Sequence, residues 1–249
     1  MIFDREIRIL FRKELRQLAA GKSALATGAI LPVIMLGFVP AVLSAAARTP
    51  PHGHPPPPSM QIGLLGDLAT DPRHFAGSIL PIFVAIVGMV LPTMMASYLL
   101  ITERERRTLE LLVALPVRIE QVLVAKLLAT LAASLALSLP LLIADVIVLP
   151  LVSAASLEQV IALPLLLLAG LALSTSMALL MSLLAKDFRT ANNVAGALLA
   201  PIIILTLVGG MLLPGGVVRP IGIAVAYTIV AAFVMRHALK TVTFERLLS

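Results

Sequence analysis

Residues 124–149 read VAKLLATLAASLALSLPLLIADVIVL, a run of 26 residues in which only Lys126 and Asp145 are charged. Because roughly 20 apolar residues in a helix are enough to cross the hydrocarbon core of a bilayer, this run predicts a membrane-spanning helix. Five further apolar runs of comparable length are separated by charged or turn residues; they cover residues 23–46, 78–101, 159–185, 191–213 and 220–239. The sequence therefore predicts an all-α integral membrane protein with six transmembrane helices.

The composition is too apolar for one water-soluble core. Of 249 residues, 59% are hydrophobic and 13% are charged, whereas a soluble domain has about 45–50% apolar and about 25% charged residues. Six spans leave no room within these residues for a separate soluble catalytic domain. Cysteine is absent, which excludes disulfides, thiolate nucleophiles and cysteine zinc sites in this chain.

The distribution of Lys and Arg predicts the orientation, since short loops rich in these residues stay in the cytoplasm. With the N-terminus in the cytoplasm, 16 of the 19 Lys and Arg residues fall on that side, and Arg48, Arg73 and Arg219 fall on the other. Both termini are therefore expected in the cytoplasm. The net charge of +6 follows from this topology, so we expect no nucleic-acid partner.

The first 22 residues have the pattern of an amphipathic helix. Apolar residues recur among basic ones at a spacing of three to four; they are Phe3, Ile7, Leu10, Phe11, Leu15 and Leu18. Such a helix is expected on the cytoplasmic leaflet, either as a lipid anchor or as a docking element for a partner protein. The predicted organisation is an interfacial helix over 1–22, a six-span domain over 23–239 and a cytoplasmic tail over 240–249.

The chain shows no motif for catalysis or nucleotide binding. Gly21, Lys22 and Ser23 resemble the end of a phosphate-binding loop, but Arg16 stands where that motif needs a second Gly. The four histidines lie in the first outer loop or at a span end. We therefore expect no metal site and no Ser-His-Asp arrangement in the membrane, and any ATP has to be bound by a partner.

Asp145 is the only ionisable residue well inside a predicted span. An intramembrane carboxylate is a functional candidate by default, because burying its charge in lipid costs several kcal/mol. It stands five residues before Pro150, so it is also expected close enough to the outer headgroups to reach water. Asp145 is accordingly a candidate for the substrate path.

The fifth span is the least regular of the six. Its C-terminal part is rich in helix-breaking residues, namely Gly209, Gly210, Pro214, Gly215 and Gly216. Either the helix continues to the end of the run, or it ends early and residues 209–220 form a re-entrant segment. Six spans, and five spans plus a re-entrant segment, are both compatible with the sequence.

The loop between the second and third spans is dense in charge. It reads ERERRTLELLVALP over residues 103–116. Helical spacing places Glu103, Arg106, Arg107 and Glu110 on one face and leaves Leu109, Leu112 and Val113 as an apolar patch. Pro116 then ends the helix. This pattern suits contact with another protein, although a charged loop resting on the membrane surface has the same pattern.

The loop resembles the first cytoplasmic loop of the permease family of ABC-2 type transporters, which reads approximately Glu-Arg-Glu, two residues, Thr-Leu-Glu, an apolar stretch, a Pro and later a Lys. The matching residues are Glu103, Arg104, Glu105, Thr108, Leu109, Glu110, Leu112, Pro116 and Lys126. The plan of an amphipathic helix followed by six spans is also similar. Arg107 and Ala125 replace two glycines common in the family, which affects the local backbone path and leaves the coupling role in place.

The resemblance implies the permease subunit of an ATP-driven exporter in the bacterial inner (plasma) membrane. It also implies a second permease copy or homologue and two separate ATP-binding subunits, which use ATP and Mg, while this chain binds no cofactor and catalyses no step. A coupling helix over about 103–116 would sit in a groove of the ATPase. Its residues would be Glu103, Arg104, Glu105, Arg106, Arg107, Thr108, Leu109, Glu110, Leu112 and Pro116.

Two other classes stay open on the residues alone. An ion-coupled secondary transporter needs intramembrane charges or broken helices around a coupling ion, and Asp145 is the one residue that qualifies. A non-transporting membrane scaffold would stimulate no ATPase. The sequence does not specify the cargo, since sodium ions, drugs, lipids and glycolipids are all compatible with it.

Overall fold

The computed structural model describes residues 5–46, 72–105, 119–184 and 188–241, in which there are helices and short turns and no strand. The helices are α1 (Arg5–Ala20), α2 (Lys22–Ala46), α4 (Pro72–Glu105), α6 (Ile119–Leu151), α7 (Leu157–Leu184), α8 (Phe188–Leu212) and α9 (Val218–Thr241). The predicted all-α class is confirmed for this part of the chain. Each of the six predicted apolar runs coincides with one of the helices from α2 to α9.

Four helices are long and apolar enough to cross a membrane, judged by length and composition. Their apolar segments are Phe75–Ala96 in α4, Val124–Leu151 in α6, Leu157–Ala178 in α7 and Val218–His237 in α9. Helices α2 and α8 contain shorter apolar segments, Gly28–Leu43 and Ala197–Leu212, within the residues whose side chains are described. The chain is therefore an integral multi-pass membrane protein, and the count of six spans stays a prediction.

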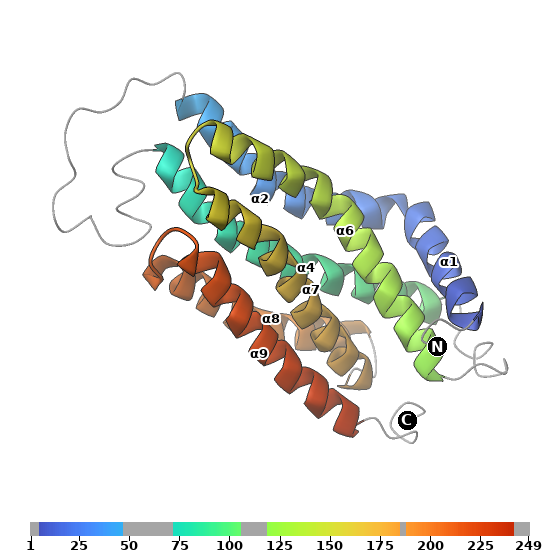
Figure 1. Cartoon of the computed structure of the whole chain (residues 1–249). Helices are drawn as coiled ribbons and strands as arrows, with labels where there is room; N and C mark the ends of the chain where they lie inside the picture. The colour runs from blue at the N-terminus through green and yellow to red at the C-terminus, as the bar shows by residue number, and fades with distance from the viewer. Residues whose placement is uncertain (1–4, 47–71, 106–118, 185–187, 242–249) are drawn as a thin grey trace.

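The helices form one bundle with α4 in the middle. Helix α4 contacts α2, α6, α7, α8 and α9. Figure 1 shows the long helices side by side, with the α6–α7 and α8–α9 turns at the same end of the bundle. Helix α1 lies toward the opposite end, against the first turns of α6. Successive long helices thus run in opposite directions, as repeated membrane crossing requires.

Two glycines allow α4 and α7 to pack closely. A Cβ built on Gly170 would lie 3.1 Å from backbone atoms of Gly88, so the two helix backbones almost touch there. One turn further along, the hydroxyls of Thr93 and Ser174 share a hydrogen bond of 2.8 Å. Small residues and interhelical hydroxyl bonds are the usual means of packing helices in a membrane. This crossing fixes α7 against the central helix.

The α6–α7 turn follows from local capping. The Ala154 N–H donates to the Leu149 carbonyl at 2.9 Å and the Ser153 N–H to the Pro150 carbonyl at 3.1 Å, which are the two bonds of a Schellman motif. Ser153 has a φ of 56°, the left-handed conformation that this motif uses. The Ser156 hydroxyl then accepts from the Gln159 N–H at 3.3 Å and caps the start of α7.

The irregular region after the fifth apolar run is a helix end and a turn. Helix α8 continues through Gly209 and Gly210, ends at Leu212, and is followed after five residues by α9. Gly216 has a φ of 74°, which is favourable for Gly and strained for residues with a Cβ. The helix therefore continues to within one residue of the end of the predicted run, and the choice between six spans and five spans plus a re-entrant segment stays a prediction.

Candidate functional site

The predicted coupling segment begins as the last turn of α4. Helix α4 includes Glu103, Arg104 and Glu105. The last of them lies four residues, or about 6 Å along the helix axis, beyond the predicted span that ends at residue 101. The remaining predicted residues lie outside the described part of the chain; they are Arg106, Arg107, Thr108, Leu109, Glu110, Leu112 and Pro116. The segment joins the end of α4 to the start of α6.

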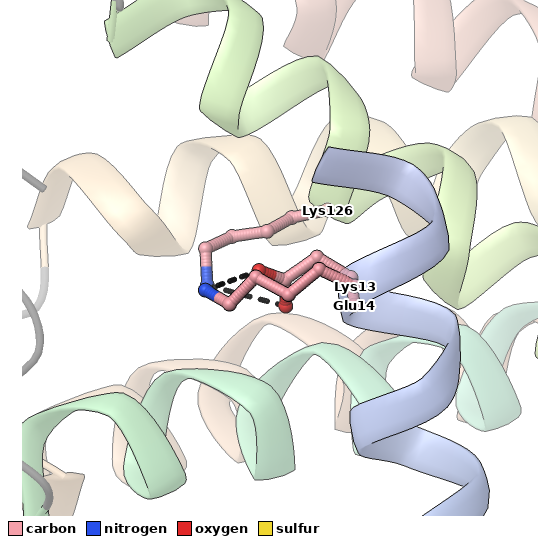
Figure 2. A network of polar contacts seen from close by, with 3 residues as sticks. All are labelled: Lys13, Glu14 and Lys126. Atoms are coloured by element: carbon pink, nitrogen blue, oxygen red, sulfur yellow. Dashed lines mark hydrogen bonds and ion pairs between the residues drawn. The ribbon is translucent and has the colours of Figure 1, made fainter. Parts of the chain in front are cut away.

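A buried ion pair holds α1 against the start of α6. Glu14 is 1% exposed, and its Oε2 lies 3.8 Å from Nζ of Lys126 in the second turn of α6. Nζ of the neighbouring Lys13 lies 3.3 Å from Oε1 of Glu14. Figure 2 shows both lysines with the Glu14 carboxylate. Positive charges on two sides offset the large cost of taking this carboxylate out of water.

The face of α1 that carries Glu14 packs on the protein. Ile7 and Leu18 are buried, and Phe11 packs against the core. These residues and Glu14 recur at intervals of four, three and four, so they form one helix face. Exposed side chains cover other parts of α1; they are Arg8, Ile9, Arg12, Lys13, Leu15 and Arg16. Part of the predicted apolar stripe therefore contacts protein, and the interfacial position of α1 stays a prediction.

These parts meet at one end of the bundle, which we call the coupling end. It consists of Glu14 in α1, Lys126 in α6 and the charged end of α4 over residues 103–105. Helix α1 contacts both α4 and α6, and in Figure 1 it lies beside the end of α4 and the start of α6. A force applied to the loop between α4 and α6 would act on two membrane helices and, through the ion pair, on α1.

A second polar cluster joins α4, α7 and α9 at the other end. Pro81 has no N–H, so the Gly77 carbonyl four residues earlier lacks its helical donor. Nε2 of Gln159 donates to that carbonyl at 2.6 Å. Arg219 donates from Nη1 to the Ser78 carbonyl at 2.8 Å, and its Nη2 donates to Leu213 O at 3.1 Å. A side chain from α7 thus satisfies the backbone carbonyl freed by Pro81, as membrane burial requires, and Arg219 binds two further backbone carbonyls.

The Arg219 side chain is buried and does not face solvent. The distribution of Lys and Arg predicts a position on the outer side of the membrane, yet the Arg219 side chain is 1% exposed and donates to backbone carbonyls of α4 and of the α8–α9 turn. Its charge is stabilised by these charge-assisted hydrogen bonds. In this structure, Arg219 clamps the ends of three helices together.

Asp145 lies inside the bundle. It is 1% exposed, and its Oδ2 has no hydrogen-bond partner in the described part of the chain. The expectation that it reaches water is wrong, because its side chain is buried within the bundle, on a helix that packs against α2, α4 and α7. The structure does not bring Asp145 near the coupling end: 19 residues of helix separate it from Lys126, or about 28 Å.

Sequence reasoning missed Glu14, Gln159 and the clamp made by Arg219. The signal for Glu14 was present, since an acidic residue interrupts the apolar stripe of the first helix between Phe11 and Leu18. For Gln159 the sequence shows only half of the contact, because Pro81 identifies the unpaired carbonyl but not the donor, 82 residues from Gly77. Among the described residues there is no group of three or more metal-ligating side chains.

The fold and the polar contacts define a multi-pass helical membrane protein in which charged residues and helix α1 lie at one end of the bundle. The family model for the ABC-2 type transporter matches residues 5–235, and the chain belongs to that family. It is thus a transmembrane permease of the ABC transporter class and a non-catalytic component of transport. No curated protein and no solved structure matched the chain.

Proposed function

We propose that this permease is the membrane subunit of an ATP-driven exporter and receives its energy from separate ATP-binding subunits. The observation that carries the proposal is the coupling end, where the buried pair between Glu14 and Lys126 fastens α1 beside the charged end of α4. Family membership over residues 5–235 makes ABC-type ATPases the matching partners. These subunits would bind ATP and Mg, and this chain would bind neither.

The proposed coupling passes through continuous helices. The ATPase would contact residues 103–116, and these contacts would change when its two halves close on ATP. Helix α4 is 34 residues long, or about 51 Å, and is in contact with five other long helices. A displacement at its charged end would therefore be transmitted along most of the bundle. Lys126 and Glu14 would make α1 follow α6.

The proposed assembly contains a second permease copy or homologue in the bacterial inner membrane. The asymmetry of Lys and Arg supports a cytoplasmic position for both termini and for residues 103–116. Exposed apolar side chains along α6, α7 and α9 support contact with lipid or a second permease over much of the surface. Asp145 is proposed to line the substrate path, since it is buried and its Oδ2 has no hydrogen-bond partner among the residues that the structure describes.

The first prediction concerns Glu103 and Glu110. If these charges contact the ATPase, removing one partner of a desolvated pair costs about 2–5 kcal/mol at the interface, whereas an exposed ion pair contributes only about 0–1 kcal/mol to folding. Glu103→Ala and Glu110→Ala are therefore expected to keep expression and membrane insertion while ATP-driven transport and transport-linked ATPase activity fall together. Both activities are measured in proteoliposomes that contain permease and ATPase.

The matched control is Glu158→Ala, which removes an exposed acidic residue from the first turn of α7 at the opposite end. This variant is expected to transport normally. Normal transport by the Glu103 and Glu110 variants, or failure only through loss of the protein from the membrane, contradicts the assignment of the coupling segment.

A further inference from the structure

One face of α6 carries a polar stripe through an otherwise apolar span. Thr130, Ser134 and Ser138 are 2%, 0% and 1% exposed. They repeat every four residues, and Asp145 follows seven residues after Ser138, so all four lie on the same side of the helix. This side is turned toward the interior, where α6 packs against α2, α4 and α7.

The hydroxyl groups of this stripe can still accept hydrogen bonds from another group, but they have no proton left to donate. Thr130 Oγ1 donates to the Leu127 carbonyl at 2.8 Å, Ser134 Oγ to the Thr130 carbonyl at 2.7 Å, and Ser138 Oγ to the Ser134 carbonyl at 2.8 Å. A hydroxyl has one proton and two lone pairs. Because each proton is used within α6, the oxygens can offer lone pairs to a passing group but no donor. Such a surface favours cations over anions.

Asp145 completes this surface with an acidic group that has no ion-pair partner among the described side chains. Its Oδ2 has no hydrogen-bond partner in the part of the chain that the structure describes. Lys126 is about 28 Å away along the helix, and Arg219 donates to carbonyls of Ser78 and Leu213. A carboxylate buried in a membrane is costly unless it is paired. A cation that enters the bundle would supply the missing partner.

We propose that Asp145, at the end of the acceptor stripe of α6, is a cation-binding site in the membrane, and that the cargo of the exporter carries a positive charge. The extension to cargo rests on the proposed function. The shared chemistry of the ligand is a single positive charge, carried by an alkali metal ion or by an organic cation. Anionic cargo is disfavoured, since the stripe offers it neither a donor nor a cation.

The test uses the full permease, purified without any ATPase, and N,N′-dicyclohexylcarbodiimide, an apolar reagent that modifies carboxyl groups inside membranes. Labelling of each carboxyl is followed by mass spectrometry of peptides, with sodium chloride in one arm and tetraphenylphosphonium chloride in the other, against choline chloride. At about ten times its dissociation constant, a bound cation should slow labelling of Asp145 about tenfold by mass action. Glu14 is the internal control, because it is equally buried but pairs with Lys126.

Protection of Asp145 by sodium supports the site and assigns a metal ion, and protection by tetraphenylphosphonium supports it and assigns an organic cation. Glu14 labelling should be unchanged in both arms, and Asp145→Asn should remove the label at this position. Equal labelling of Asp145 in all three salts overturns the proposal, as does absence of labelling without a cation, which would mean that a protein group already engages the carboxyl. Since no ATPase is present, either result leaves the exporter assignment to be decided by its own transport test.

Discussion

Glu14 is the residue on which the position of α1 depends most. Its carboxylate is nearly inaccessible, 3.8 Å from Nζ of Lys126. Breaking a buried ion pair by removing one partner costs about 3–5 kcal/mol, because the other charge stays buried. We therefore predict that Glu14→Gln lowers the thermal unfolding midpoint of the purified permease and weakens its association with the ATPase.

Lys13→Gln is the control for this change, since the Lys13 side chain is 46% exposed and an exposed pair contributes about 0–1 kcal/mol. The double variant Glu14→Lys with Lys126→Glu should recover part of the loss by restoring opposite charges. Equal unfolding midpoints for Glu14→Gln and Lys13→Gln would show that the pair does not hold α1 in place.

Glu14 and Asp145 differ in how much of their structural role could be predicted from the sequence. Asp145 is recognisable from sequence because a carboxylate in an apolar run has no local explanation. Its burial is not recognisable, since it depends on the packing of α6 against helices that are distant in the sequence. Glu14 is one of nine charged residues in the first 22, so its charge carries no signal by itself. Only the apolar residues on the same helix face distinguish it from the exposed ones.

At the scale of elements, the crossing of α4 and α7 leaves little space for an added side-chain atom. A Cβ on Gly170 would meet backbone atoms of Gly88 and Met89 at 3.1–3.3 Å, and backbone cannot move aside as a side chain can. Overpacking typically costs about 1–3 kcal/mol. Gly170→Ala should therefore separate the helices, weaken the Thr93–Ser174 hydrogen bond and lower the unfolding midpoint.

Gly37→Ala serves for comparison, because Gly37 also lies within a helix but a Cβ there meets nothing within 4 Å. Its unfolding midpoint is expected to match that of the unchanged protein. A Gly170→Ala variant as stable as Gly37→Ala would mean that α4 and α7 are further apart than described.

The elements were the most predictable part of this protein. An apolar run of roughly 20 residues has one common solution in lipid, a helix, and the six predicted runs coincide with helices. Their ends were less predictable: α4 continues through Glu105, four residues beyond the predicted span, because a helix need not stop where the hydrocarbon does. The contacts of Gln159 and Arg219 join residues 82 and 141 positions apart, and no local pattern identifies such partners.

At the scale of the whole molecule, the two ends of the bundle have different chemistry. One end carries the buried pair of α1 and α6 and the charged end of α4. The other carries backbone carbonyls held by Gln159 and Arg219. A permease driven from one side needs one end that receives a partner and another that can be closed. We therefore expect the ATPase to bind at the coupling end alone.

The most direct test of this claim is site-specific photocrosslinking in intact cells that express the permease with its ATPase. The photoreactive residue p-benzoylphenylalanine is placed at Thr108 in one variant and at Ser59, in the predicted outer loop, in another. If the ATPase binds at the coupling end, an adduct forms at Thr108 whose peptides come from an ATP-binding subunit, and no such adduct forms at Ser59. An ATPase adduct at Ser59, or none at Thr108 while the ATPase still co-purifies with the permease, would contradict this claim.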